Sequence, residues 1–263
     1  MEKNFFNSEP LVFAHRGASV EYPENTLPSF KKAVDLGVDV IETDVHFIKD
    51  NGFVIVHDAV LDRVSNGSGN VLNYSMDELK QFDAGYYFTD DNGKTYPYRG
   101  KGITFLSLDE LLEEFPNQRF NIDLKTKNLD QIKYYVDIIK RCKAEQRVLT
   151  ASEHYKNLRA VRGVLPQIAT SLCYREILMF YFLYRSGLLF LNFPINGDAL
   201  QVPEFYGSFR VVSRAFVKQA HKRRVRVHVW TINNENDMKR LIDMGVDGIM
   251  SDNPELLMRV MGK

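Results

Sequence analysis

Apolar residues along the chain follow two spacings that alternate with each other. Short apolar runs are separated by longer stretches in which apolar residues recur at helical spacing. This rhythm is typical of a parallel sheet covered by helices. It predicts nine strands, at Leu11–His15, Val38–Val45, Phe53–His57, Arg119–Lys125, Val148–Ser152, Ile168–Leu172, Ala199–Val202, Val225–Ile232 and Asp247–Ser251.

Two of these strands are joined by a turn that is too short for a helix. Val38–Val45 and Phe53–His57 are separated by Lys49-Asp50-Asn51-Gly52, a tight-turn sequence. We therefore expect Phe53–His57 to lie antiparallel on its neighbour. Eight strands remain, which is the number in a TIM (β/α)8 barrel, so residues 1–263 are predicted to form one α/β barrel domain.

Helices are predicted between most of the strands, at Thr26–Leu36, Leu129–Cys142, Glu153–Arg162, Ser213–Arg223, Asn234–Met244 and Asn253–Met261. Two segments do not fit the rhythm. Residues Ala59–Leu106 are rich in Gly, Asn, Asp and Tyr, and we expect a capping insertion there, after the second barrel strand, with one short helix near Ser75–Phe82. Tyr174–Gly197 is expected to be a second insertion, apolar and irregular.

Ionisable side chains stand at the ends of predicted strands that begin with apolar residues. Residues two apart on a strand share a face, so Glu42 and Asp44 lie side by side at the end of Val38–Val45. Polar groups at the carboxyl ends of barrel strands face the catalytic mouth. This rule brings together His15, Glu42, Asp44, His57, Asp123, Lys125 and Trp230.

The three carboxylates in this set, Glu42, Asp44 and Asp123, indicate a cation site. Converging carboxylates repel one another in a dry mouth, and a cation relieves that repulsion. Oxygen ligands favour a hard divalent ion, so Mg²⁺ or Ca²⁺ is expected before Zn²⁺, with Mn²⁺ as a further candidate. A salt-bridged patch of acids is the structural alternative.

The remaining polar residues of the set suit the cleavage of a phosphodiester. Arg16 and Lys125 carry positive charge for the non-bridging oxygens of a phosphate. His15 and His57 titrate near neutral pH and are candidates for general acid and general base. Trp230 is a candidate substrate wall. Each residue alone has an ordinary structural reading, such as an ion pair of Lys125 with its neighbour, and the interpretation depends on their joint occurrence.

Composition excludes some classes of protein. Lysine and arginine number 34, as do aspartate and glutamate, so the zero net charge offers no basic stripe for nucleic acid. Cys142 and Cys173 are too few for a disulfide framework and favour a reducing compartment. The N-terminus lacks the apolar core of a signal peptide, and we expect a cytoplasmic protein. The apolar stretch 177–195 is interrupted by Arg185 and Gly187, so it predicts peripheral contact with a membrane rather than a span.

Four motifs resemble the glycerophosphodiester phosphodiesterase family. They are Ala14-His15-Arg16-Gly17, Pro23-Glu24-Asn25-Thr26, Glu42-Thr43-Asp44-Val45 and His57-Asp58. The similarity continues through Asn121-Ile122-Asp123-Leu124-Lys125, Trp230-Thr231 and the segment from Asp247 to Pro254, and so covers nearly the whole chain.

The resemblance implies a TIM barrel with a small capping insertion, a metal bound by Glu42, Asp44 and a third carboxylate, and acid–base roles for His15 and His57. It also implies a route in two steps. The glycerol 2-hydroxyl attacks phosphorus and expels an alcohol, and water then opens the cyclic phosphate to glycerol 3-phosphate. The chain departs from the family in one respect, because the third carboxylate, usually glutamate, is here the shorter Asp123.

Three hypotheses about function follow. The first is hydrolysis of water-soluble headgroup diesters such as glycerophosphocholine. The second is a membrane-surface lysophospholipase D, since the apolar segment Tyr181–Phe190 is similar to that branch of the family and would form a lip for one acyl chain. A buried helix or a dimer contact is the alternative reading of that segment, and the oligomeric state stays open. The third hypothesis is a catalytically silent, phosphodiester-binding barrel.

Overall fold

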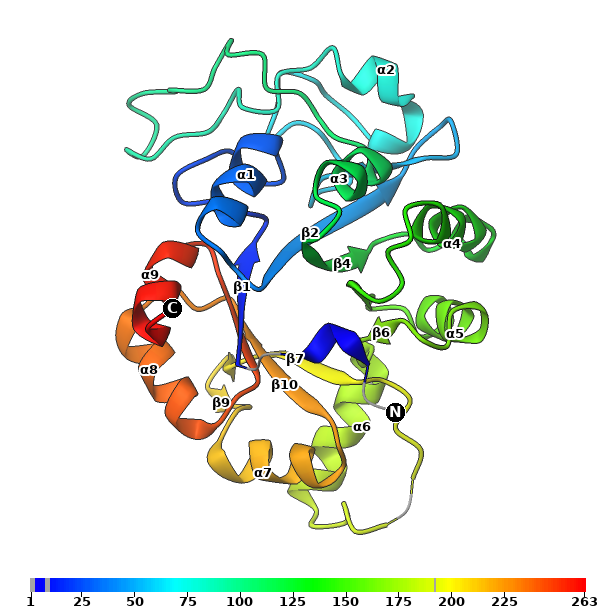
Figure 1. Cartoon of the computed structure of the whole chain (residues 1–263), viewed down its shortest axis with the longest axis vertical. Helices are drawn as coiled ribbons and strands as arrows, with labels where there is room; N and C mark the ends of the chain where they lie inside the picture. The colour runs from blue at the N-terminus through cyan, green and yellow to red at the C-terminus, as the bar shows by residue number, and fades with distance from the viewer. Residues whose placement is uncertain (1–2, 8–9, 192) are drawn as a thin grey trace.

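The computed structural model describes residues 3–7, 10–191 and 193–263. Within these ranges eight parallel strands form a nearly closed barrel in the order β6-β5-β4-β2-β1-β11-β10-β7 (Figure 1). These strands are β1 (Leu11–His15), β2 (Val40–Phe47), β4 (Arg119–Leu124), β5 (Val148–Ala151), β6 (Ala169–Thr170), β7 (Ala199–Pro203), β10 (Arg226–Trp230) and β11 (Gly248–Ser251). A parallel bridge between Ser171 and Ala199 joins β6 to β7. The predicted TIM barrel is therefore confirmed.

Two short antiparallel elements are added to the barrel. β3 (Phe53–Ile55) pairs with the end of β2, as the tight turn predicts, and Asn51 takes a φ of 65° in that turn. A left-handed φ is readily tolerated by asparagine. β8 (Phe205–Tyr206) and β9 (Phe209–Arg210) form a hairpin after β7, which the sequence analysis did not predict.

The helices alternate with the strands and cover the outside of the barrel (Figure 1). They are α1 (Leu27–Asp35), α3 (Leu108–Glu114), α4 (Ile132–Arg141), α5 (Tyr155–Val164), α6 (Tyr174–Arg185), α7 (Arg214–Lys222), α8 (Glu235–Met244) and α9 (Pro254–Met261). The six helices predicted between strands all form. Short 3₁₀ turns lie at Asn4–Phe6 and Leu129–Gln131.

Two predictions about the helices need correction. The segment Tyr174–Gly197 is not irregular throughout, because its first part is the twelve-residue helix α6. Helix α3 was not predicted at all, although Ser107 and Glu110 form the reciprocal capping box that marks a helix start. Both helices occupy the usual position between consecutive barrel strands.

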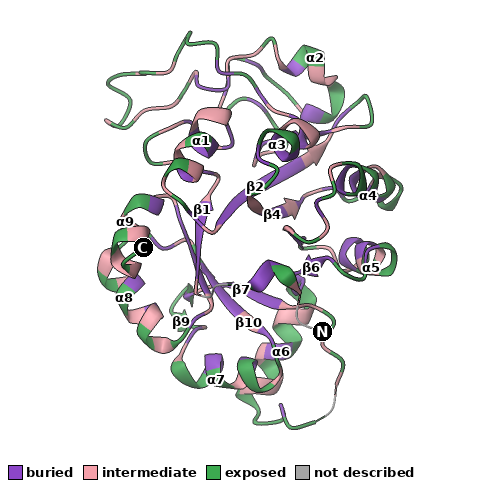
Figure 2. Ribbon diagram, in the orientation of Figure 1, coloured by how far each residue is buried: buried purple, intermediate pink, exposed green. Residues whose placement is uncertain are grey.

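Residues 56–106 lie to one side of the barrel, beyond α1 and α3 in Figure 1. They contain a 3₁₀ turn (Val71–Asn73) and the short helix α2 (Met76–Leu79), which confirms the helix expected near Ser75–Phe82. This insertion has its own apolar cluster, which includes Leu61, Val71 and Leu79, each fully buried. Figure 2 shows how much of its remaining chain is exposed.

The main core fills the space between the strands and the surrounding helices. A second cluster lies inside the barrel, where Phe5 and Phe6 pack with Leu11, Phe13 and Val40 near the amino ends of the strands. The barrel interior is thus filled at the amino ends of the strands, which leaves the carboxyl ends free for a site. No helix in the described ranges combines the length and the apolar character needed to cross a membrane.

Candidate active site

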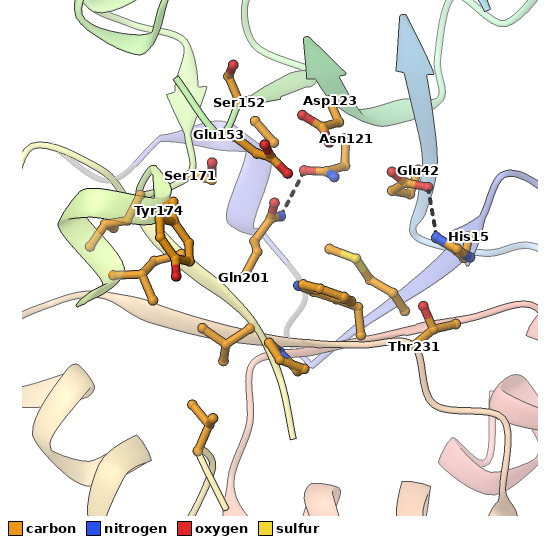
Figure 3. Close-up of a pocket in the computed structure, with 18 of the residues that line it drawn as sticks. His15, Glu42, Asn121, Asp123, Ser152, Glu153, Ser171, Tyr174, Gln201 and Thr231 are labelled. Carbon is orange, nitrogen blue, oxygen red and sulfur yellow. Dashed lines mark hydrogen bonds and ion pairs between the residues drawn. The ribbon is translucent and has the colours of Figure 1, made fainter. Parts of the chain in front are cut away.

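A pocket of about 770 Å³ opens at the carboxyl ends of the barrel strands. It is lined by all eight residues singled out from the sequence: His15, Arg16, Glu42, Asp44, His57, Asp123, Lys125 and Trp230. Figure 3 shows the acidic end of this pocket, with Glu42 from β2 beside Asp123 and Asn121 from β4. The alternation of side chains and the position within each strand therefore predicted correctly that seven of these residues, all except Arg16, meet at one pocket.

His15 is held between two carboxylates. Its Nδ1 lies 2.6 Å from Oδ1 of Asp252, and its Nε2 lies 3.8 Å from Oε2 of Glu42. The second contact follows from strand register, because His15 on β1 is paired with Glu42 on β2. Burial alone lowers the pKa of His15, but the Glu42 and Asp252 carboxylates outweigh it and raise that pKa above its ordinary value.

His57 is oriented in the same way by the residue that follows it. Its Nδ1 lies 2.7 Å from Oδ1 of Asp58. The other oxygen of Asp58 accepts a hydrogen bond from Nε of Arg63, in the insertion. Burial raises the pKa of Asp58, but Arg63 and His57 lower it further, so this carboxylate stays ionised. A carboxylate only accepts hydrogen bonds, so Nδ1 carries the proton and Nε2 of neutral His57 is left as a base.

The three predicted metal ligands stand on adjacent strands. Asp44 on β2 is in register with Asp123 on β4, and both side chains enter the pocket. Lys125 lies between these two carboxylates, with Nζ 3.0 Å from Oδ1 of Asp44 and 2.6 Å from Oδ2 of Asp123. Arg16 adds a second positive charge, 3.4 Å from Oδ2 of Asp44.

The carboxylates differ in how their charge is compensated. Burial, and then repulsion by Asp44, raises the pKa of Glu42 to about 8. Burial, together with repulsion by Asp44, also raises the pKa of Asp123 in spite of the nearby Lys125. For Asp44 the balance is reversed, because Lys125 and Arg16 overcome the effect of burial and lower its pKa. The site thus has more buried acid than its two cationic side chains neutralise.

The donor set suits a hard divalent cation in chemical type, since it consists of carboxylate oxygens. In the described part of the chain, however, no three side chains of His, Cys, Asp or Glu are gathered tightly enough to hold a metal ion as they stand. Lys125 is the physical reason, because its ammonium group lies between Asp44 and Asp123. The three-carboxylate site therefore remains a prediction.

Several features of the site were missed from the sequence. Asp252 follows the last barrel strand, so the same rule on strand ends would have found it. Gln201 on β7 donates to Oδ1 of Asn121 at 2.9 Å, and both line the pocket, but mid-strand amides carry no sequence signal of this kind. Arg63 was missed because nothing in its local sequence shows which distant acids it contacts.

The end of the pocket away from the acids is apolar. Figure 3 shows Tyr174 across the pocket from His15 and Glu42. This wall comes from α6 and from the β8–β9 hairpin and consists of Tyr174, Ile177, Leu178, Tyr181, Tyr206 and Phe209. The predicted apolar lip, Tyr181–Phe190, was placed too late in the chain. Helix α6 starts at the carboxyl end of β6 and leads away from the mouth, so its first turns face the pocket.

Comparison with known proteins agrees with this geometry. Residues 15–256 match the model of the glycerophosphoryl diester phosphodiesterase family. A glycerophosphodiester phosphodiesterase of Caldanaerobacter subterraneus is 33% identical, over 96% of this chain and 98% of that protein. The human lysophospholipase D GDPD1 is 26% identical, over 93% of this chain and 83% of that protein.

A solved structure is also similar over nearly its whole length. It is a phosphodiesterase of Oleispira antarctica in complex with the product sn-glycerol-3-phosphate, with a TM-score of 0.77 and 26% identity. The match covers 97% of this chain and 98% of that one. The fold, the set of residues at the pocket and the match over residues 15–256 lead to one conclusion: this chain is a member of the glycerophosphoryl diester phosphodiesterase family.

Proposed function

We propose that the protein hydrolyses glycerophosphodiesters to glycerol 3-phosphate and an alcohol. The observation that carries the proposal is the pair of imidazoles, His15 and His57, that line one pocket and are each held at Nδ1 by a carboxylate. A relative with the same fold binds sn-glycerol-3-phosphate as its product. Arg16 and Lys125 supply positive charge beside the imidazoles, where a phosphate would lie.

The residues present can perform the two-step route. In the first step one imidazole takes the proton of the glycerol 2-hydroxyl as its oxygen attacks phosphorus, and the other imidazolium gives a proton to the departing alkoxide. In the second step water attacks the cyclic phosphate and the bond between phosphorus and the 2-oxygen breaks. The two imidazoles exchange roles, so one takes the proton of the water and the other returns a proton to the 2-oxygen. Arg16 and Lys125 neutralise the negative charge on the phosphoryl oxygens in both steps. The carboxylate partners of the histidines, Asp252 and Asp58, do not line the pocket, so they act on the substrate only through the imidazoles.

We further propose that one divalent cation, Mg²⁺ or Ca²⁺ with Mn²⁺ as a further candidate, binds at Glu42, Asp44 and Asp123. Support comes from Glu42, a buried carboxyl group whose pKa of about 8 reflects uncompensated burial and repulsion. A bound cation would polarise a phosphoryl oxygen and neutralise developing charge. Calorimetric titration with each metal tests binding without turnover, and Glu42→Ala is expected to weaken it. Equal affinity in the variant and the wild type would remove Glu42 from the ligand set.

The activity is tested by release of glycerol 3-phosphate from glycerophosphocholine and glycerophosphoethanolamine. His15→Ala and His57→Ala are each expected to abolish release while the protein stays folded. His154→Ala is a matched control, since His154 precedes α5 and does not line the pocket. Normal turnover in either catalytic variant would contradict the assigned roles. Absence of turnover on every glycerol diester, with and without metal, would favour the silent barrel instead.

Lysophospholipids are a second candidate substrate class, favoured by the apolar wall of the pocket. The wall formed by α6 and the hairpin is continuous with the acidic end, so an acyl chain attached to glycerol has an apolar surface to lie on. Substrate pairs with and without the acyl chain test this. Ile177→Asn is expected to lower turnover of the acylated diester and to spare the soluble one, and equal loss on both would count against the lipid.

A further inference from the structure

Helix α6 presents an apolar stripe to solvent. Tyr174, Leu178 and Phe182 are spaced four residues apart, so they lie on one face of the helix. All three are exposed, and Phe182 is 65% exposed. The opposite side of the helix is already anchored, because Phe180 is fully buried against Phe216. At least half of each side chain in the stripe is therefore left uncovered by the described chain.

The β8–β9 hairpin continues this stripe. Phe205, Tyr206 and Phe209 are all exposed, between 49% and 72%. The hairpin lies beside α6, because the Tyr181 hydroxyl donates to the carbonyl of Arg210. Tyr206 and Phe209 also line the same pocket as Tyr174 and Leu178. We call these six residues the lip: Tyr174, Leu178, Phe182, Phe205, Tyr206 and Phe209.

Within residues 173–214, which contain the lip, exposed charge has one sign, whereas Glu153 on the acidic side of the pocket is an exposed acid. Arg175 and Arg185 are exposed on the same side of α6 as the stripe. The acids between residues 173 and 214 are each buried or half-buried and paired with a cation: Glu176 with Arg162, Asp198 with Lys3, and Glu204 with Arg240. An exposed apolar surface with arginines at its edge is the composition of a segment that lies in the headgroup region of an anionic membrane.

We propose that the lip docks the enzyme on a lipid surface that carries anionic headgroups. Four of its six side chains, Tyr174, Leu178, Tyr206 and Phe209, line one pocket, which is where a substrate would leave the lipid layer. The lip is not the stretch 177–195 that the sequence suggested for membrane contact, although Leu178 and Phe182 belong to both. Residues 186–191 lie at the other end of the barrel, where Arg223 at the end of α7 donates to the carbonyls of Leu189 and Leu191.

The proposal rests on the proposed function only in taking the neighbouring pocket as the catalytic one, and docking can be measured without turnover. The whole protein is sedimented with vesicles of phosphatidylcholine, alone or mixed with phosphatidylglycerol. The test variant is Phe182→Ser combined with Phe205→Ser, two exposed residues that do not line the pocket. The control is Phe190→Ser, which removes a phenylalanine that is 77% exposed, more than either Phe182 or Phe205, from the other end of the barrel.

We expect the wild type to sediment with the mixed vesicles and more weakly with phosphatidylcholine alone. The double variant is expected to bind the mixed vesicles at least about tenfold more weakly, from the apolar area withdrawn from the lipid. The control is expected to bind like the wild type. Arg175→Gln with Arg185→Gln is expected to reduce the preference for phosphatidylglycerol and to leave binding to phosphatidylcholine unchanged.

Trp230 gives a second, independent measurement. It is the one tryptophan of the sequence and lies half-exposed at the pocket. Its emission is expected to shift to shorter wavelength when mixed vesicles are added to the wild type or the control, and not when they are added to the double variant. Turnover of glycerophosphocholine in solution is expected to be equal in all three proteins.

Three results would overturn the proposal. They are no binding of the wild type to either vesicle, equal binding of the double variant, and equal loss in the control. If light scattering shows that the wild type is a dimer and the double variant a monomer, the lip is instead a contact with a second copy of the chain. A protein that binds vesicles through the lip but cleaves no diester would retain this inference and lose the proposed function, so the two failures are distinguishable.

Discussion

A chain of charged groups links His57 to Arg16 across the boundary between the insertion and the barrel. Asp58 contacts His57 at one oxygen and Arg63 at the other. Arg63 extends two further hydrogen bonds, of 2.9 and 2.7 Å, to the carboxylate of Glu24, and Glu24 accepts from Arg16 at 3.0 Å. We expect Asp58 and Arg63 to act as positioning residues, and Asp58→Ala to lower kcat by about tenfold with little change in KM.

The magnitude follows from the contacts that are lost. A hydrogen bond to a charged group contributes about 1.5–3 kcal/mol. The His57 side chain is 35% exposed and Arg63 is 49% exposed, so solvent screening places the effect at the lower end of that range. About 1.4 kcal/mol corresponds to a tenfold change in rate. The loss is expected in kcat because His57, in its proposed role, acts on protons in the transition state and contributes little to binding the ground state.

The assay is steady-state release of glycerol 3-phosphate from glycerophosphocholine over a range of pH. Asp58→Asn keeps an acceptor for Nδ1 without the charge and is expected to recover part of the loss. Arg63→Gln is expected to show a smaller fall in kcat, and Arg63→Lys only partial recovery, because lysine lacks the fork that spans Asp58 and Glu24. Asp90→Ala, an exposed acid in the same insertion, is the control. An unchanged kcat in Asp58→Ala, or a loss confined to KM, would refute the reasoning.

Three further predictions concern stability. Burial lowers the pKa of His228 to about 3, so the folded protein resists a proton that the unfolded chain takes up below about pH 6.5. The free energy of unfolding, measured in denaturant titrations, should be highest above that pH and should fall by about 2 kcal/mol at pH 5. His228→Gln should abolish this part of the pH dependence. Lys125→Met removes the cation between Asp44 and Asp123 and should destabilise the protein by about 3–5 kcal/mol, and a bound divalent cation should recover more thermal stability in the variant than in the wild type. Ser107→Ala should cost about 1 kcal/mol through loss of the α3 cap, and an unchanged melting temperature would show that tertiary packing alone fixes the helix.

The barrel and its polar residues could be predicted because both follow from short-range rules. Inward and outward side chains alternate along each strand, and carboxyl ends of parallel strands meet at one rim. Glu42 and Asp44 therefore had to lie together, and register then places Asp123 next to Asp44. These rules act within one strand or between neighbours, and they need no knowledge of distant contacts.

Contacts between distant residues could not be predicted in the same way. Arg63 in the insertion meets Glu24 across 39 residues of sequence. Such a contact depends on how the insertion packs against the barrel, which apolar periodicity does not record. The β8–β9 hairpin was not predicted for another reason. Each of its strands has only two residues, which is too short to show an alternation of apolar and polar positions.

Helix α6 escaped prediction because the usual contrast between a buried and an exposed face is missing. Phe180 packs into the core on one side, yet Tyr174, Leu178 and Phe182 are exposed and apolar on the other. A helix that is apolar on both sides shows no 3.6-residue period of apolar positions, so the sequence predicts an irregular apolar insertion there. A helix in water gains nothing from an exposed apolar face. Conflict between local pattern and fold is expected where function demands it, and here it coincides with the mouth of the pocket. The exposed apolar side chains that removed the helical period from the sequence are therefore the ones whose exposure a lipid surface would explain.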